Sequence, residues 1–238
     1  MNDLQIPWQD KPVVELVTRF VEDLKPHGVV LNGDIVDCYS LSEFSKNPLV
    51  DYTLAREARE AAALLHRLAK VSKERWWIGG NHEDRLRRAV WKNPEFSELN
   101  ELQFPELFHL TDNGFRWKPY GGVIRLGKLL VTHGDMVNKH SGWTARAHFD
   151  KYGNSVLHGH THRLGVYYRT NAKGVHAGYE NGCLCRLNPE YVQYPDWQQG
   201  FSVVHVADGG WFNVQQIPVL QRSRFFYGGA LVQTRKAA

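Results

Sequence analysis

Stretches with helical spacing of apolar residues alternate with short apolar runs along most of the chain. In 11–24, Leu16 and Phe20 belong to a series of apolar residues at intervals of three and four, the pattern of an amphipathic helix. Pro26 and Gly28 end that pattern, and the apolar run that follows is typical of a buried strand. The same reasoning predicts helices over 11–24, 54–71, 83–91 and 142–152, and strands over 28–31, 75–78, 123–126, 129–132, 155–157, 164–169, 201–206 and 211–217.

Turn signals and the absence of internal boundaries indicate how these elements are organised. Gly127-Lys128 joins two apolar runs in the manner of a two-residue hairpin, and Asp208-Gly209-Gly210 is a second hairpin signal. We find no internal repeat, no low-complexity linker and no change of composition along the sequence. We therefore expect an α/β protein with a single domain over residues 1–238.

Composition narrows the class of protein. Hydrophobic residues make up 42% and charged residues 23% of the 238 positions, which is ordinary for a soluble globular chain with a core. No run of eighteen apolar residues is present and the N-terminus lacks a signal-peptide pattern, so we expect no membrane association. Three cysteines do not make a disulfide framework, which favours the cytoplasm.

The charge balance is mildly basic. A formal net charge of +4 is compatible with an anionic substrate, but it also fits an ordinary solvated surface. The twelve histidines are more informative because several of them fall in tight polar clusters.

Five short polar clusters lie at or near the ends of strand patterns. In open α/β architectures, functional residues gather beyond the carboxyl ends of strands, and flanking glycines leave room for a ligand. The clusters are Asp3-Leu-Gln5, Gly33-Asp34-Ile-Val-Asp37, Gly80-Asn81-His82-Glu83, Thr132-His133-Gly134 and Gly159-His160-Thr-His162.

The side chains in these clusters are carboxylates, carboxamides and imidazoles, a donor set that suits Mn, Fe, Zn or Mg ions. Two such ions about 3.5–4 Å apart can clamp a phosphate oxygen and activate water. One carboxylate must then bridge them, and Asp34 is the natural candidate because its loop opens directly from an apolar strand.

Taken singly, the clusters allow other interpretations. Asn81 followed by Glu83 could simply begin a helix. His160 and His162 would point the same way on an extended segment and could face one site, although a structural pair is also an option. The occurrence of all five clusters in this order favours the metal site.

The ordered set resembles that of the calcineurin-like metallophosphoesterase superfamily. Its members carry Asp-x-His, Gly-Asp-x-x-Asp, Gly-Asn-His-Glu/Asp, a later His and Gly-His-x-His in this order, and the resemblance covers residues 3 to about 163. Further segments look like small phage-borne members: Tyr39-Ser-Leu-Ser-Glu-Phe44, Asn81-His-Glu-Asp-Arg-Leu86, Asn181-Gly-Cys-Leu-Cys185, Asn188-Pro-Glu-Tyr191 and Trp197-Gln-Gln-Gly-Phe201.

The resemblance implies a fold and a set of residue roles. The fold would be a four-layer αββα sandwich of two mixed β-sheets flanked by helices. Asp34 would bridge two divalent metal ions, with Asp3, Gln5 and His162 at the first ion and Asn81, His133 and His160 at the second. His82 would be catalytic beside the phosphate and Asp37 would orient it, while Asn81, His82 and Arg85 would contact substrate.

Two departures from the family pattern stand out. Gln5 occupies the position of a histidine in most members, and its neutral carboxamide is a weaker ligand. The first site would then bind metal less tightly or favour Mn or Mg, or Gln5 would lie just outside the ligand shell. The family's first strand would precede Asp3, where only Met1 and Asn2 stand, so either the chain is shortened or Asp3 is anchored less firmly.

The implied function is two-metal hydrolysis of a phosphate ester through a hydroxide that bridges the metals, with manganese as the expected ion. Basic charge and the phage-like segments favour a phosphodiester of DNA, RNA or nucleotides as substrate. The alternatives are a phosphomonoesterase and a binding or scaffold protein with a degenerate metal site. Arg87 and Arg88 are more readily explained as an exposed helix face paired with Glu83 and Asp84.

Overall fold

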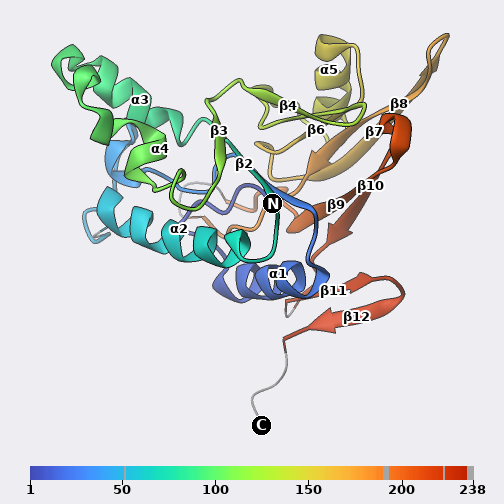
Figure 1. Ribbon diagram of the computed structural model, residues 1–238, viewed down its shortest axis with the longest axis horizontal. Coiled ribbons are helices and arrows are strands. Elements are labelled where there is room, and N and C mark those ends of the chain that lie inside the picture. The colour runs from blue at the N-terminus through green and yellow to red at the C-terminus, as the bar shows by residue number, and fades with distance from the viewer. Residues whose placement is uncertain (51, 190–192, 222, 235–238) are drawn as a thin grey trace.

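The computed structural model describes residues 1–50, 52–189, 193–221 and 223–234 (Figure 1). Glu190 and Tyr191 of the phage-like Asn188-Pro-Glu-Tyr191 segment lie outside the described residues. The helices and strands are α1 (Lys11–Leu24), β1 (Gly28–Asn32), α2 (Leu54–Ala69), β2 (Glu74–Ile78), α3 (Asp84–Trp91), α4 (Phe104–Leu107), β3 (Arg116–Lys118), β4 (Val123–Leu126), β5 (Leu129–Thr132), α5 (Trp143–Tyr152), β6 (Val156–His158), β7 (Leu164–Asn171), β8 (Gly174–Asn181), β9 (Gly200–Val206), β10 (Phe212–Pro218), β11 (Arg224–Tyr227) and β12 (Ala230–Gln233).

Helix α1 shows how local sequence sets the boundaries of an element. The Asp10 carboxylate accepts a hydrogen bond from Val13 N at 3.2 Å and so caps the first turn, in which Pro12 needs no amide donor. The helix ends at Leu24, because Lys25 adopts a left-handed conformation and its amide bonds back to Val21. Between these ends the apolar face is buried, as the sequence predicted.

Within the described residues, the strands form two larger sheets and two hairpins. β1, β2 and β3 make a parallel sheet in that order. The second sheet has the order β4-β5-β6-β8-β7, in which β5, β6 and β8 are parallel and the two edge strands antiparallel. β9 pairs with β10 and β11 with β12 as antiparallel hairpins. Two mixed sheets were expected; the five-stranded sheet is mixed, whereas the pairing of β1, β2 and β3 is parallel throughout.

Three hydrophobic clusters lie between successive layers. The largest joins residues of α1 and α2, such as Leu16 and Leu65, to β1 and β2. A second joins Ile78 of β2 to Ile124 and Leu157 of the five-stranded sheet. The third, Leu130, Phe149 and Val156, lies between that sheet and α5, which Figure 1 places on the side away from α1 and α2. Three interfaces separate four layers, so the αββα sandwich is confirmed.

The predicted elements are present with small shifts at their ends, and the β4–β5 hairpin has the predicted bounds. The strands β3, β8, β11 and β12 were not predicted. β8 is mostly buried but carries small and polar residues, including Gly178, where a Cβ would fall 2.3 Å from the Ala145 carbonyl oxygen. Because close packing against α5 requires small residues here, β8 lacks the β-branched residues by which strands are recognised in a sequence.

None of the helices in the described part of the chain has the length and apolarity needed to cross a bilayer.

Candidate metal centre

Four of the five predicted clusters follow strands that end at a common edge, and the fifth, Asp3-Leu-Gln5, is hydrogen-bonded to the loop after β1. Asp34 comes after β1 and Asn81 after β2, which are parallel neighbours in one sheet. His133 comes after β5, and His160 and His162 after β6, which are parallel neighbours in the other sheet. Because both pairs of strands present their carboxyl ends to the same place, side chains that are distant in sequence converge there.

Asp34 takes part in both groups of side chains that can hold a cation at this edge. One group is Asp34, His133 and His160, and the other is Asp3, Asp34 and His162; within each group the ligand atoms lie within 4.8 Å of one another. The Asp34 Oδ2 atom is 3.3 Å from His133 Nε2. The shared carboxylate is the arrangement that a bridging ligand requires, although its role remains a prediction.

The His133 imidazole is held in the orientation of a metal ligand. Its Nδ1 donates to the Asn32 carbonyl oxygen at 2.9 Å, which leaves Nε2 as the atom that faces Asp34 and, at 3.3 Å, Asn81 Oδ1. Burial disfavours a charged ring, but the Asp34 carboxylate outweighs it and raises the pKa of His133 to about 10. The concentrated negative charge that holds this proton would equally favour a cation.

Asp3 and His160 leave buried polar atoms unsatisfied. Asp3 Oδ2 accepts from His160 N at 3.1 Å, whereas Oδ1 lies 3.1 Å from His162 Nε2 without the geometry of a hydrogen bond. His160 Nδ1 is also buried and has no hydrogen-bond partner among the described residues. Burial and the neighbouring His133 lower the pKa of His160 to about 4, so the ring is neutral. Unpaired oxygen and nitrogen donors that converge in a buried site fit a divalent cation.

The backbone of the centre is unusual. Asp3, Gln5, Asp34, His160 and His162 all have φ between 50° and 71°, in the left-handed region that non-glycine residues rarely adopt. The expectation that the two histidines lie on an extended segment is therefore wrong. They turn toward the centre from left-handed positions, a type of local strain that clusters at functional sites.

Two motif glycines are required by close approach. A Cβ at Gly33 would fall 2.2 Å from His133 Nδ1, and one at Gly80 would fall 2.0 Å from Asp34 Oδ1. Any larger residue at either position would displace these side chains.

Gln5 lies inside the centre. Its Nε2 is 3.2 Å from His162 Nε2 and 3.5 Å from His82 Nε2. Rotation of the carboxamide by a half-turn would bring Oε1 to the same position, so Gln5 can present an oxygen to a cation beside His162.

His82 is oriented by Asp37, as the sequence indicated. Its Nδ1 donates to Asp37 Oδ1 at 2.7 Å, and its Nε2 lies 3.6 Å from Asp34 Oδ2. Burial disfavours the imidazolium, but the carboxylates of Asp34 and Asp37 outweigh it and raise the pKa of His82. Arg85 Nη1 in turn donates to the Asp37 carbonyl oxygen at 2.7 Å and lies 3.3 Å from Asp37 Oδ2.

Glu83 has a role that sequence reasoning missed. Its carboxylate accepts hydrogen bonds from four backbone amides, those of Gly80, Asp34, Ile35 and Val36, at 2.7–3.3 Å. It thereby ties the loop after β1 to the loop after β2. The signal for this role in the sequence was a glutamate inside the glycine-flanked cluster Gly80-Asn81-His82-Glu83.

The arginines of α3 pair with its own aspartate. Arg87 and Arg88 lie 2.6 and 2.8 Å from Asp84, so of the two predicted acidic partners only Asp84 pairs with them.

Glu57 of α2 supports the loop that follows Asp37. It accepts from Cys38 N at 2.6 Å and from Tyr39 N at 2.9 Å. Burial outweighs these bonds and raises the pKa of Glu57 from 4.5 to about 8.

This shift predicts a pH-dependent stability. Between pH 4.5 and about 8 the folded protein holds a proton that the unfolded chain releases. The free energy of unfolding is therefore expected to fall as pH rises through this window, by at most about 1.4 kcal/mol per unit. Urea unfolding across this range, with chelator present, should show a shallower slope in Glu57→Gln than in the wild type. The exposed Glu101→Gln change is the control, and equal slopes in all three proteins would contradict the shift.

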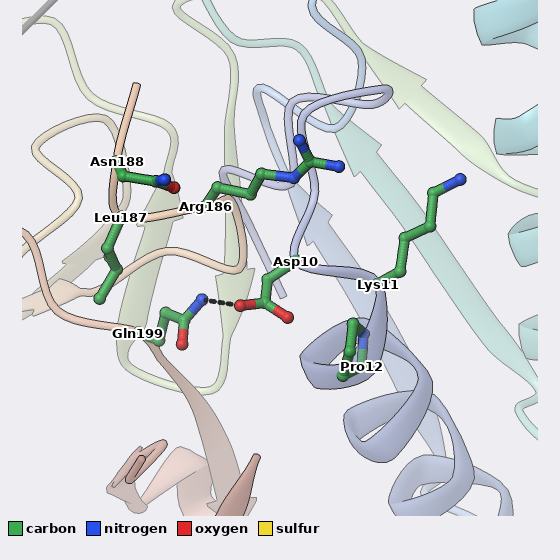
Figure 2. Close-up of a pocket in the computed structure, with 7 residues that line it drawn as sticks. All are labelled: Asp10, Lys11, Pro12, Arg186, Leu187, Asn188 and Gln199. Atoms are coloured by element: carbon green, nitrogen blue, oxygen red, sulfur yellow. Dashed lines mark hydrogen bonds between the residues drawn. The ribbon is translucent and has the colours of Figure 1, made fainter. Parts of the chain in front are cut away.

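A cavity of about 630 Å³ opens beside the first turn of α1 (Figure 2). Asp10 accepts from Gln199 Nε2 there at 3.0 Å, and Lys11 and Arg186 lie nearby. None of the described residues that line it belongs to the predicted centre, which is therefore a separate place in the molecule.

Comparison with known proteins agrees with this geometry. The sequence profile of the calcineurin-like phosphoesterase family matches residues 1–164. The Gene 54 protein of Mycobacterium phage D29 is 27% identical over 241 residues, and that of Mycobacterium phage L5 is 27% identical over 243; each alignment covers 92% of both chains. A crystal structure of Vps29 complexed with Zn²⁺ from Entamoeba histolytica aligns with a TM-score of 0.36 and 11% identity, over 86% of this chain and 94% of that one.

The family profile spans well over half of the chain and includes all five clusters that converge in the structure. Members of this family use divalent metal ions to hydrolyse esters of phosphoric acid, and the donor set at the shared edge fits such ions. The chain belongs to the calcineurin-like phosphoesterase family and is a metallophosphoesterase.

Proposed function

We propose that this enzyme hydrolyses phosphodiester bonds in nucleic acid or nucleotides with the help of two manganese ions. The observation that carries the proposal is the position of Asp34, whose carboxylate belongs to both candidate ligand groups. Two cations held on either side of one carboxylate are the arrangement suited to in-line displacement at phosphorus.

The ligand roles follow from the two groups. Asp3, Gln5 and His162 would hold the first ion, Asn81, His133 and His160 the second, and Asp34 both. When bound, the ions would supply an activated water molecule and neutralise charge on the phosphate oxygens. Oxygen and imidazole donors with a carboxamide at the first position favour manganese.

His82 would act on the substrate itself. Asp37 fixes its Nδ1 proton, so the Nε2 atom faces the centre and can stabilise charge on a phosphate oxygen or donate a proton to the leaving oxygen. Arg85 would bind a substrate phosphate with the donors that Asp37 leaves available, and it also holds Asp37 in place.

The preference for a nucleic acid or nucleotide rests on weaker support. The chain carries four more basic than acidic residues, and two relatives that align over 92% of its length come from mycobacteriophages. Cys38, Cys183 and Cys185 are free thiols, which supports a cytoplasmic location.

The test compares a chromogenic phosphodiester with the matching monoester in Mn²⁺, followed by single- and double-stranded DNA. We expect kcat/KM for the diester to exceed that for the monoester by about tenfold or more, equivalent to about 1.4 kcal/mol of transition-state stabilisation. A preference for the monoester would make the protein a phosphomonoesterase. Inactivity on every substrate with Mn²⁺, Mg²⁺, Fe²⁺ and Zn²⁺ would contradict the proposed function.

A further inference from the structure

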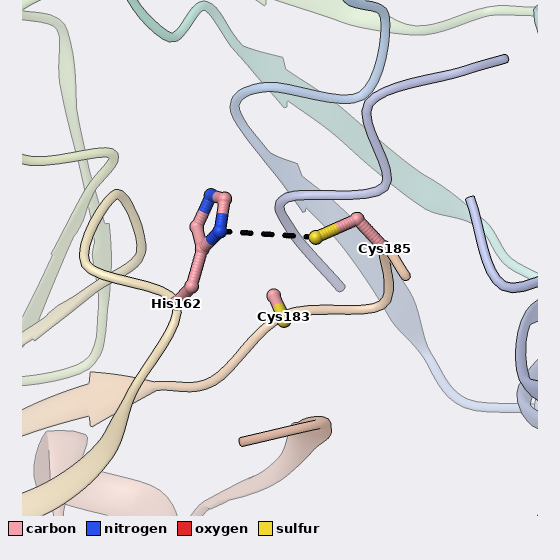
Figure 3. A group of neighbouring side chains, drawn as sticks. All are labelled: His162, Cys183 and Cys185. Carbon is pink, nitrogen blue, oxygen red and sulfur yellow. Dashed lines mark hydrogen bonds between the residues drawn. The ribbon is translucent and has the colours of Figure 1, made fainter. Parts of the chain in front are cut away.

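A third group of ligand atoms lies on the opposite side of the His162 ring. His162, Cys183 and Cys185 are all buried, and their nitrogen and sulfur atoms lie within 4.8 Å of one another (Figure 3). The Cys185 Sγ atom is 3.7 Å from His162 Nδ1, whereas His162 Nε2 faces Asp3 on the other side.

The local backbone explains why both thiols face this ring. Bridges from Cys183 to Gln199 and from Cys185 to Gln9 keep the segment after β8 extended. Alternate residues on an extended segment point to the same side, so Leu184 enters the core while both cysteines point the other way. Figure 3 shows the Cys185 sulfur directed at the His162 ring and Cys183 on the same segment of chain close to that ring.

The donor set differs in kind from that of the phosphoesterase centre. Two sulfurs and one imidazole nitrogen suit a thiophilic cation, whereas the other groups offer oxygen and nitrogen. We propose that His162, Cys183 and Cys185 form a second type of metal site, which binds one thiophilic divalent cation such as Zn²⁺ or Cd²⁺. Three protein ligands leave a fourth position of a tetrahedron for solvent.

The charge balance of binding is favourable. Two protons leave to solvent, one from the Cys183 thiol and one from the Cys185–His162 pair; two S–metal bonds form, and the two thiolates neutralise the 2+ charge. Each thiol already has a polar neighbour at this place, since Cys183 Sγ donates to the Gln198 carbonyl oxygen at 3.7 Å and Cys185 meets His162.

Occupation of this site has a consequence that rests on the proposed function. A neutral imidazole has a single lone pair, so a cation on Nδ1 places the ring proton on Nε2. His162 would then no longer serve as a ligand beside Asp3. We expect a thiophilic cation to inhibit hydrolysis through this site.

The test is a Cd²⁺ titration of the chelator-treated, reduced full-length protein, read out by the ultraviolet thiolate-to-cadmium charge-transfer band. We expect one Cd²⁺ per chain to produce the band with release of two protons. Cys183→Ser/Cys185→Ser should lose it, with affinity for this site lowered at least about 100-fold. That variant keeps Cys38, so it also controls for a lone thiol.

Failure of this proposal is separable from failure of the phosphoesterase proposal, because Cd²⁺ held only by oxygen and nitrogen gives no thiolate band. Absence of the band in the wild-type protein would overturn the site even if the double variant does not fold. An unchanged band in a folded double variant would also overturn the site. A thiol count of one instead of three in the wild-type protein before reduction would do the same.

Discussion

Replacement of Asp34 by asparagine is expected to lower kcat/KM for a phosphodiester by roughly 10³-fold or more, equivalent to about 4 kcal/mol. Asparagine has nearly the same shape and can still accept the hydrogen bond that Asp34 Oδ1 receives from His82 N at 3.0 Å. It removes the negative charge common to both ligand groups. The loss should therefore appear as weaker metal binding as well as slower turnover.

Equilibrium dialysis against Mn²⁺ tests the structural part of this prediction. The wild type should retain two ions per chain at concentrations where Asp34→Asn retains fewer. Asp112→Asn is the matched control, because Asp112 is an exposed aspartate that pairs with His109 at 3.1 Å. An Asp34→Asn protein that keeps two ions and turns over like the wild type would exclude a bridging carboxylate at this position.

The candidate centre could be predicted from sequence because its candidate ligand residues lie in short sequence motifs. Asp34, Asn81 and His133 each follow a recognisable apolar strand, so the parallel order of β1 with β2 and of β5 with β6 brings them together. For these residues a local pattern and a general rule of α/β folds were sufficient. The role of Asp37 came from the family resemblance, which implied that it orients His82 or a neighbouring ligand, and Asp37 Oδ1 accepts a hydrogen bond from His82 Nδ1.

The prediction that depended on backbone conformation was wrong. His160 and His162 have the spacing of alternate residues on a strand, yet both adopt left-handed φ values. Strain of this kind is held by tertiary contacts, for example the bond from His160 N to Asp3, which is 157 residues away in sequence. Such contacts have no local signature. β8 escaped prediction for a related reason, because its burial selects small residues in place of branched ones.

Glu83 shows what motif reasoning leaves out. From the sequence, Glu83 was interpreted as part of a helix start and as a partner for nearby arginines. In the structure its carboxylate accepts hydrogen bonds from main-chain amides of the two loops that carry Asp34 and Asn81, and so joins these loops. Glu83 is 2% exposed, and Ile35 and Val36, whose amides donate to it, are fully buried. Its contribution is therefore to the shape of the centre.

Replacement of Glu83 by alanine is expected to lower the free energy of unfolding by roughly 4 kcal/mol. The change strands four buried amide donors, each of which costs about 1–3 kcal/mol when unpaired, although the losses do not add fully. For a chain of this length the melting temperature should fall by roughly 10 °C.

The measurement is thermal unfolding of the chelator-treated protein. Burial raises the pKa of Glu83 to about 7, so a pH above that value keeps the carboxylate ionised. Glu43→Ala is the control, because Glu43 is an exposed residue whose ion pair with Lys92 lies in solvent and contributes little to stability. Glu83→Gln retains one acceptor oxygen and should fall between wild type and alanine, since its amide group can no longer accept from the other donors. Equal melting temperatures for Glu83→Ala and Glu43→Ala would show that the two loops are held together by packing and not by this carboxylate.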